Sequence, residues 1–152
     1  MQLHRLAVAL AALPLALVAC DSGPKPVTDP GALAQAEKRA STDPKHLMGV
    51  EWRCVSVRSD AGPGGAPLTL TFGDEGRVTG FGGVNRFSGP YTSAQGTLRI
   101  GPLVATKMAG EPASMAFEQR LFEALAKVDG FSLQSGLLRL KHGDQVVAEY
   151  SR

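Results

Sequence analysis

Alternating hydrophobic and polar positions recur through the second half of the chain and predict a series of short β-strands. Leu68, Leu70 and Phe72 alternate with two threonines, the period of two that a half-buried strand requires. A tight turn at 73–76 leads into the run 77–81, so these two strands form a hairpin. Further strands are predicted at residues 52–57, 91–95, 97–100, 103–106, 131–134, 137–141 and 145–150.

Two regions do not follow this pattern cleanly. The strand 52–57 carries apolar residues on both sides, so alternation alone does not say which side faces the core. Glycine and proline dominate the segments 60–67 and 82–90, and we predict a loop in the first and a Gly-rich connection in the second.

One stretch has the spacing of an amphipathic helix. Pro112 suits a first helical position, and Gly130 predicts the stop. The apolar stripe consists of Met115, Phe117, Leu121, Phe122, Ala124, Leu125 and Val128. Strands, one helix and further strands joined by tight turns predict an α+β fold, with an antiparallel, rolled or barrel-like sheet and one packed α-helix.

The N-terminal segment 1–19 has a different pattern, a short charged start followed by an apolar run over 6–18. The run has the length of a signal-peptide core and is too short for a permanent transmembrane helix. It ends in LVAC at 17–20, which resembles the lipobox of bacterial lipoproteins. That resemblance implies cleavage before Cys20 and a lipid anchor on Cys20. The alternative is an ordinary secretory signal that contains a cysteine.

Composition then divides the chain into three parts. We expect a signal peptide over 1–19, a lipidated N-terminus and flexible tether rich in proline over 20–46, and one domain over 47–152. A short helix could form at 33–39, and the alternative to a tether is a segment that binds a partner. The formal net charge of +2 falls by one on removal of the signal, so no basic surplus indicates nucleic acid. We expect a monomer in the cell envelope, facing the periplasm on the inner or the outer membrane.

The sequence contains few residues in arrangements suited to catalysis. His46 and His142 lie at opposite edges of the predicted domain and lack neighbours at the spacing of a nucleophile–base pair or a metal site. The sequence GFGGVN at 80–85 departs from a dinucleotide fingerprint at Asn85, and no helix follows. Cys54 is a candidate redox thiol, although a strand cysteine beside Trp52 is more often a small buried hydrophobe. We therefore predict no cofactor, no metal and no enzyme activity.

The order of several segments resembles the META domain, or HslJ-like, family of heat-shock and envelope lipoproteins. The segments are Trp52, LTLTF at 68–72, GRVTG at 76–80, GVNRFSGPY at 83–91, IGPLVATKMA at 100–109 and the helix at 118–125. The match covers about residues 47–150. Family members are associated with heat shock, envelope stress and novobiocin resistance without an agreed reaction, so the resemblance implies a stress-related or binding role.

The chain departs from the family pattern at two positions. Family members typically carry cysteine where this chain has Val84 and Gly110. The paired loss suggests that the two positions face each other, with Val84 filling part of the volume. Two residues with Cα atoms more than about 7 Å apart could not be bridged. With Cys20 lipidated, Cys54 is the one remaining thiol.

Three functions follow from these observations. The first is a membrane-anchored binding protein without catalysis. The second is an accessory or inhibitory module docking on an envelope protein, which predicts an exposed aromatic patch around Phe81, Phe87 and Tyr91. The third is a small-molecule enzyme, which requires a pocket where polar side chains converge. The candidate surface or binding residues are Asn85, Arg86, Thr106 and Lys107.

Overall fold

The computed structural model describes residues 30–152, so Cys20 and the signal segment lie outside the described part. The helical elements are α1 (Pro30–Ala40), the short 3-10 turn η1 (Pro44–His46) and α2 (Pro112–Leu125). The strands are β1 (Glu51–Val57), β2 (Asp60–Ala61), β3 (Thr69–Phe72), β4 (Arg77–Phe81), β5 (Arg86–Ala94), β6 (Thr97–Ile100), β7 (Val104–Ala105), β8 (Gly130–Gln134), β9 (Leu137–His142) and β10 (Gln145–Ser151).

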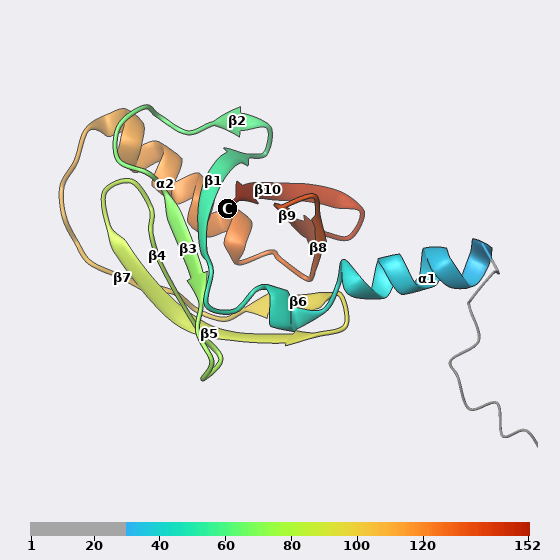
Figure 1. Cartoon of the computed structure of the whole chain (residues 1–152). Helices are drawn as coiled ribbons and strands as arrows, with labels where there is room; N and C mark the ends of the chain where they lie inside the picture. Colours follow the sequence, from blue (N-terminus) through green and yellow to red (C-terminus); the bar gives the residue numbers. More distant parts are fainter. Residues whose placement is uncertain (1–29) are drawn as a thin grey trace, which may run out of the picture.

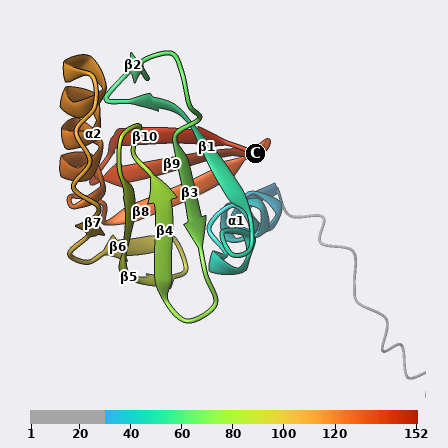
Figure 2. The same ribbon diagram turned by 90° about the vertical axis from the view of Figure 1, so that its left-hand side faces the viewer.

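The strands form one antiparallel sheet that curls into a ring (Figure 1). Its order is β10-β9-β8-β6-β5-β4-β3-β1, and pairing of β1 with β10 closes the circuit. The seam between β6 and β8 is the weakest link, with Thr97 opposite Gly130 as its paired position. Helix α2 lies alongside the sheet (Figure 2) and contacts β10 and β1. The predicted α+β class, a rolled antiparallel sheet with a packed helix, is confirmed.

Alternation along the strands separates the core from the outer face. On β3 and β4, Leu70, Phe72 and Val78 are fully buried, while the intervening threonines point outward. Phe72 meets Tyr91 edge-on with ring centroids 5.0 Å apart. The other large, fully enclosed side chains are Leu47, Trp52, Val57, Leu98, Phe117, Leu121, Leu125, Leu138, Leu140 and Tyr150. Burying apolar side chains of this size stabilises a fold by roughly 1.5–3 kcal/mol each.

A β-bulge settles the ambiguous strand β1. Its pairing with β10 shifts register between Cys54 and Ser56, and an extra residue reverses which side chains face inward. Trp52 before the shift and Val57 after it are therefore both buried, although they stand on opposite sides of a regular strand. The indole nitrogen of Trp52 donates to the carbonyl of Leu47 at 3.1 Å.

The predicted Gly-rich connection at 82–90 is wrong over most of its length. Residues 82–85 form the turn, and β5 already begins at Arg86. Gly89 lies in the strand, where it pairs with Val78, and a larger residue would not fit because its Cβ would lie 2.8 Å from Leu103 Cδ2. Pro90 follows where β5 changes partner from β7 to β6, a position at which a missing N–H costs no ladder bond.

The predicted helix begins at Pro112 but ends earlier than expected. It stops at Leu125, and Gly130 opens β8 instead of ending the helix. The stripe residues are buried or packed against the core, except Met115, which is exposed. The loop predicted at 60–67 also contains the two-residue strand β2.

Helix α1 forms within the segment expected to be a tether and includes the helix suggested at 33–39. Backbone hydrogen bonds to the strands follow directly after it. The amide of Leu133 donates to the carbonyl of Ser41 at 2.7 Å, and the amide of Gly96 donates to the carbonyl of Thr42 at 2.9 Å. None of the helices in the described part is long and apolar enough to cross a bilayer.

Candidate functional site

A buried carboxylate on α2 holds the turn between β4 and β5. Glu118 Oε2 accepts hydrogen bonds from the backbone amides of Val84 at 3.0 Å and Asn85 at 2.6 Å. Glu118 Oε1 accepts from Asn85 Nδ2 at 2.7 Å. A side chain at Gly82 would collide with this carboxylate, since its Cβ would lie 2.7 Å from Oε2. Charge-assisted bonds of this kind are about twice as strong as neutral ones.

The other side of the Asn85 amide holds the segment after β7. Asn85 Oδ1 accepts from Thr106 Oγ1 and from the amide of Met108, both at 2.7 Å, and Nδ2 also approaches the Met108 carbonyl at 3.5 Å. Asn85 is thus 6% exposed and does not belong to the surface set that the sequence suggests. Its amide joins the β4–β5 turn, helix α2 and the strap 106–111, which leads from β7 to α2.

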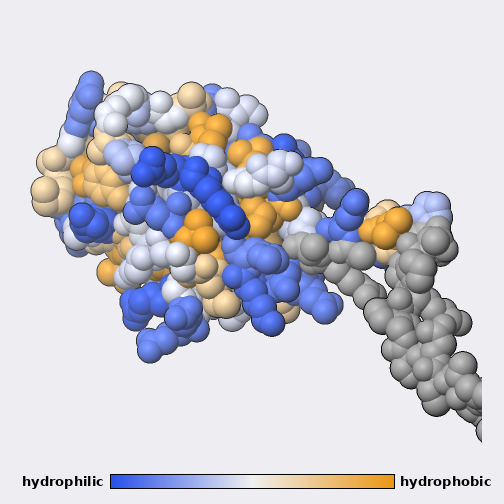
Figure 3. Space-filling view, in the orientation of Figure 1, coloured by the Kyte–Doolittle hydropathy of each residue, from blue (hydrophilic) through white to orange (hydrophobic). Residues whose placement is uncertain are grey.

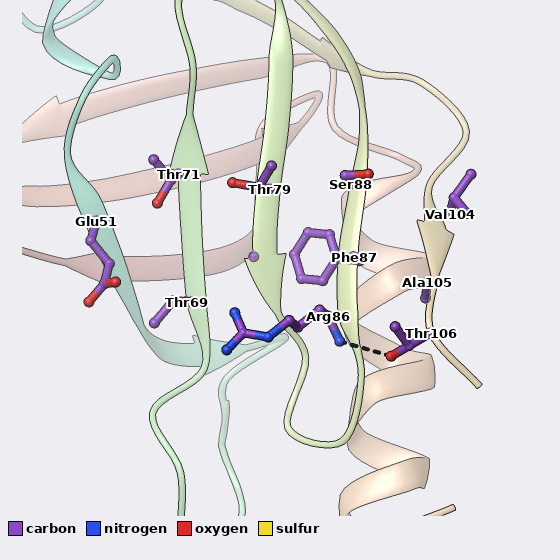
Figure 4. A pocket seen from close by; sticks show the side chains of 11 residues that line it. Glu51, Thr69, Thr71, Thr79, Arg86, Phe87, Ser88, Val104, Ala105 and Thr106 are labelled. Carbon is purple, nitrogen blue, oxygen red and sulfur yellow. Dashed lines mark hydrogen bonds between the residues drawn. The ribbon is translucent and has the colours of Figure 1, made fainter. Parts of the chain in front are cut away.

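An open groove of about 530 Å³ lies on the outer face of the sheet (Figure 4). Its polar lining consists of Glu51, Thr69, Thr71, Thr79, Arg86, Ser88 and Thr106. These side chains come from β1, β3, β4, β5 and the end of β7. In Figure 4 the Arg86 side chain reaches back across β4 towards Thr69. The Arg86 amide donates to Thr106 Oγ1 at 3.3 Å.

Strand register places the groove side chains in one row. Thr71 stands opposite Glu51 on one side and Thr79 on the other. Thr79 in turn pairs with Ser88, and Ser88 pairs with Val104. The row therefore crosses five strands, with neighbouring strands about 4.8 Å apart, and its three middle strands carry hydroxyl groups.

The other residues considered from the sequence lie apart from the groove. Lys107 is exposed and lies outside the groove lining. His142 Nδ1 lies 3.1 Å from Asp129 Oδ2, and His46 is in η1. Among residues 30–152, no three His, Cys, Asp or Glu side chains gather in a metal-binding group.

Cys54 is partly buried and faces Tyr150 across β1 and β10. Burial raises the pKa of the Cys54 thiol to about 11. Burial also raises the pKa of Tyr150, and the charge of an ionised Cys54 adds to that rise. Both groups are therefore neutral at physiological pH, and none of the described residues supplies a cation that lowers the pKa of the Cys54 thiol, as in an activated thiol.

Val84 and Gly110 are adjacent, as the paired loss of cysteines suggests. A Cβ on Gly110 would lie 3.3 Å from Val84 Cβ and 2.6 Å from Val84 Cγ2. With two further bonds of about 1.5 Å each, the Cα atoms are inside the roughly 7 Å limit for a disulfide. Val84 thus fills the space beside the strap.

The exposed aromatic patch predicted around three rings is wrong. Phe87 and Tyr91 are buried, and Phe81 is half-buried. Phe87 packs inward against Phe122, with ring centroids 5.3 Å apart. On the face drawn in Figure 3, hydrophobic residues form small patches separated by hydrophilic ones.

The sequence did not single out Glu118 or the threonines of the groove. Glu118 stands within the apolar stripe of α2, between Phe117 and Leu121, and a charged residue on a buried stripe signals a required partner. Thr69, Thr71 and Thr79 are the polar half of the strand alternation, a pattern that equally describes any solvated strand face.

Comparison with known proteins finds one matching family model and two solved structures of similar fold. A family model described as the META domain matches residues 45–152. An NMR structure of a protein from Burkholderia xenovorans has 23% identity and a TM-score of 0.60, covering 100% of this chain and 98% of that one. A second NMR structure has 23% identity and a TM-score of 0.58, covering 72% and 93%. At this identity both show a similar fold. No curated protein matches the chain.

Proposed function

The chain belongs to the META domain family, and from that premise we propose that it is a lipid-anchored, non-enzymatic binding protein of the bacterial cell envelope. The anchor rests on the lipobox-like sequence that ends at Cys20. A role in envelope stress rests on the family resemblance. The single observation that carries the binding role is the open groove with its row of hydroxyl groups and Arg86.

The hydrogen bonds that Asn85 already makes within the protein favour binding over catalysis. An enzyme built from Asn85, Arg86, Thr106 and Lys107 requires these four side chains to converge in one pocket. The Asn85 amide instead uses its oxygen and its nitrogen to hold Thr106, Met108 and Glu118. Arg86 lines the groove with its guanidinium, and Thr106 Oγ1, which donates to Asn85 and accepts from the Arg86 amide, can still accept one further hydrogen bond.

The anchor is tested in cells with a Cys20→Ala variant. A clickable palmitate analogue should label the unmodified protein and leave the variant unlabelled, and the variant should leave the membrane fraction. Equal labelling of both would contradict the anchor at Cys20, and membrane retention of the variant would show another means of attachment.

Binding at the groove is tested with a photo-crosslinking residue in intact cells. We expect position 88, in the groove, to capture envelope material that mass spectrometry identifies. Position 119, exposed on α2 and outside the groove, is the matched control. Equal capture at both positions, or none at position 88, would contradict a binding role for the groove.

Docking on an envelope protein is the second candidate, and exposed apolar side chains at and beside the rim of the groove favour it. Val104 and Met108, at and just after β7, are 74% and 63% exposed, and such apolar side chains are enriched in interfaces. A crosslinker at position 108 should then capture one protein repeatedly, whereas capture at position 88 alone would favour the groove.

A further inference from the structure

We propose that the groove binds an anionic saccharide, a polyhydroxylated chain that carries carboxylate or phosphate groups. This inference rests on the proposed binding role of the groove and names its ligand class. Its volume of about 530 Å³ lies in the range of known ligand sites, which hold roughly 300–1,000 Å³. Its open side would let a longer chain pass across it.

Hydroxyl groups are the main chemistry that the groove offers. Thr71, Thr79 and Ser88 stand side by side on three neighbouring strands, and Thr69 lies two residues from Thr71 on the same face. A hydroxyl both donates and accepts a hydrogen bond. Sugar hydroxyls have the same double capacity, so a row of threonines can satisfy them along several units of a chain.

The charge of this face favours an anion. Arg77 lies two residues before Thr79, and its Nη1 donates to Ser88 Oγ at 3.4 Å, which places this guanidinium beside the hydroxyl row. Arg86 is the cation of the groove itself.

Glu51 is the acidic residue of the groove lining, and it already has a cation beside it. Arg53 Nε lies 3.8 Å from Glu51 Oε1. With Glu51 opposed in this way, the two arginines on β4 and β5 leave a positive surplus. A guanidinium binds carboxylate and phosphate through paired hydrogen bonds.

The groove is also accessible from the side away from the chain entry. In Figure 1, helix α1 extends to the right, while β3, β4 and β7 lie on the left. Figure 2 shows β3 and β4 towards the viewer, with α1 behind them. The groove therefore opens on the side of the domain opposite helix α1.

Binding is measured by calorimetry on the full-length protein in detergent. The anionic saccharides are trigalacturonate and maltotriose with one terminal phosphate, which distinguish carboxylate from phosphate. Maltotriose tests hydroxyls without charge, and triglutamate tests charge without sugar hydroxyls. At least one anionic saccharide should bind tenfold or more tightly than either control, and added salt should weaken it.

Variants locate the binding. Arg86→Gln should weaken the anionic saccharide about tenfold, the effect of one charged hydrogen bond. A double variant, Thr71→Val with Thr79→Val, keeps the shape and the strand preference of both residues and should weaken it similarly. Arg99→Gln, on β6 outside the groove, is the matched control and should change affinity less than twofold. Thermal melts confirm that each variant is folded.

Three results would overturn the proposal: equal binding of triglutamate, equal binding of maltotriose, or no binding of either anionic saccharide. The crosslinking experiment separates this failure from failure of the binding role. If position 88 still captures envelope material while the anionic saccharides fail, the groove binds a ligand of another class. If both experiments fail, the binding role fails as well.

Discussion

At the scale of single residues, Glu118 and Asn85 show how hydrogen-bond direction fixes amino-acid identity. Both Glu118 oxygens face donors, the Val84 and Asn85 amides and Asn85 Nδ2. Asn85 cannot turn its oxygen towards Glu118, because that oxygen already accepts from Thr106 and Met108. Only a group with two accepting oxygens satisfies this side of the network.

We therefore expect Glu118→Gln to destabilise the protein, although the two side chains have nearly the same shape. Its NH₂ group would face another donor, so the free energy of unfolding should fall by about 2–3 kcal/mol. Urea denaturation measures the change. Glu123→Gln, exposed on the same helix, should cost less than about 0.5 kcal/mol. Equal effects of the two variants would argue against a special role for Glu118.

Cys54 gives a prediction about pH. Its pKa rises from 9.0 to about 11 on folding, so the unfolded thiol loses its proton at a lower pH than the folded thiol. The stability that this group contributes is complete below pH 9 and is lost as pH rises from 9 to 11. Urea denaturation between pH 7 and 10.5 should show falling stability, with a smaller fall in Cys54→Ala. Identical pH profiles for the two proteins would contradict the raised pKa.

At the scale of elements, the alternation of side chains predicted most strands, and it failed where a local contact overrode composition. Gly89 and Pro90 indicate a loop when only their backbone preferences are considered. They lie within β5 because both pair with β4, and position 89 is glycine because Leu103 occupies the space beside it. That neighbour is distant in the sequence, so the sequence alone could not supply it. The bulge in β1 is a similar case, since it depends on pairing with β10.

The candidate site was only partly predictable for the same reason. Arg86 and Thr106 were singled out by the sequence and do meet at the groove. Asn85 came from the same segment, but its partner Glu118 lies 33 positions further along the chain. The groove hydroxyl groups line up only because the strands pair in a particular register. The sequence of each separate strand does not reveal that register.

The contact between the β4–β5 turn and the strap can be converted into a covalent link. We expect a double variant, Val84→Cys with Gly110→Cys, to form a disulfide and raise stability by about 3 kcal/mol, less any native strain. Gly110→Ala alone should destabilise, because its Cβ would lie 2.6 Å from Val84 Cγ2. Thermal melts with and without reductant, together with thiol counting, measure both. Two free thiols at these positions under oxidising conditions would contradict the geometry.

At the scale of the whole molecule, the domain starts before its first long strand. The backbone carbonyls of Ser41 and Thr42 accept hydrogen bonds from the amide of Leu133, in β8, and the amide of Gly96, just before β6. A chain starting at residue 47 leaves both amides without these acceptors, and we expect it to lose about 2 kcal/mol of stability. A chain starting at residue 41 should match one starting at residue 30. Guanidinium denaturation compares the three, and equal stability of all would show that the contacts contribute little.

Pairing of β1 with β10, which closes the ring, also affects the order in which the protein folds. Arg53 on β1 pairs with Ser151 on β10, so this ladder cannot form until β10 is available. Contacts between such distant residues slow folding, because the entropy of loop closure must be overcome first. Until then β1 carries an unpaired edge, the kind that recruits other strands. The interval before the last strand arrives is thus when this protein is most exposed to aggregation.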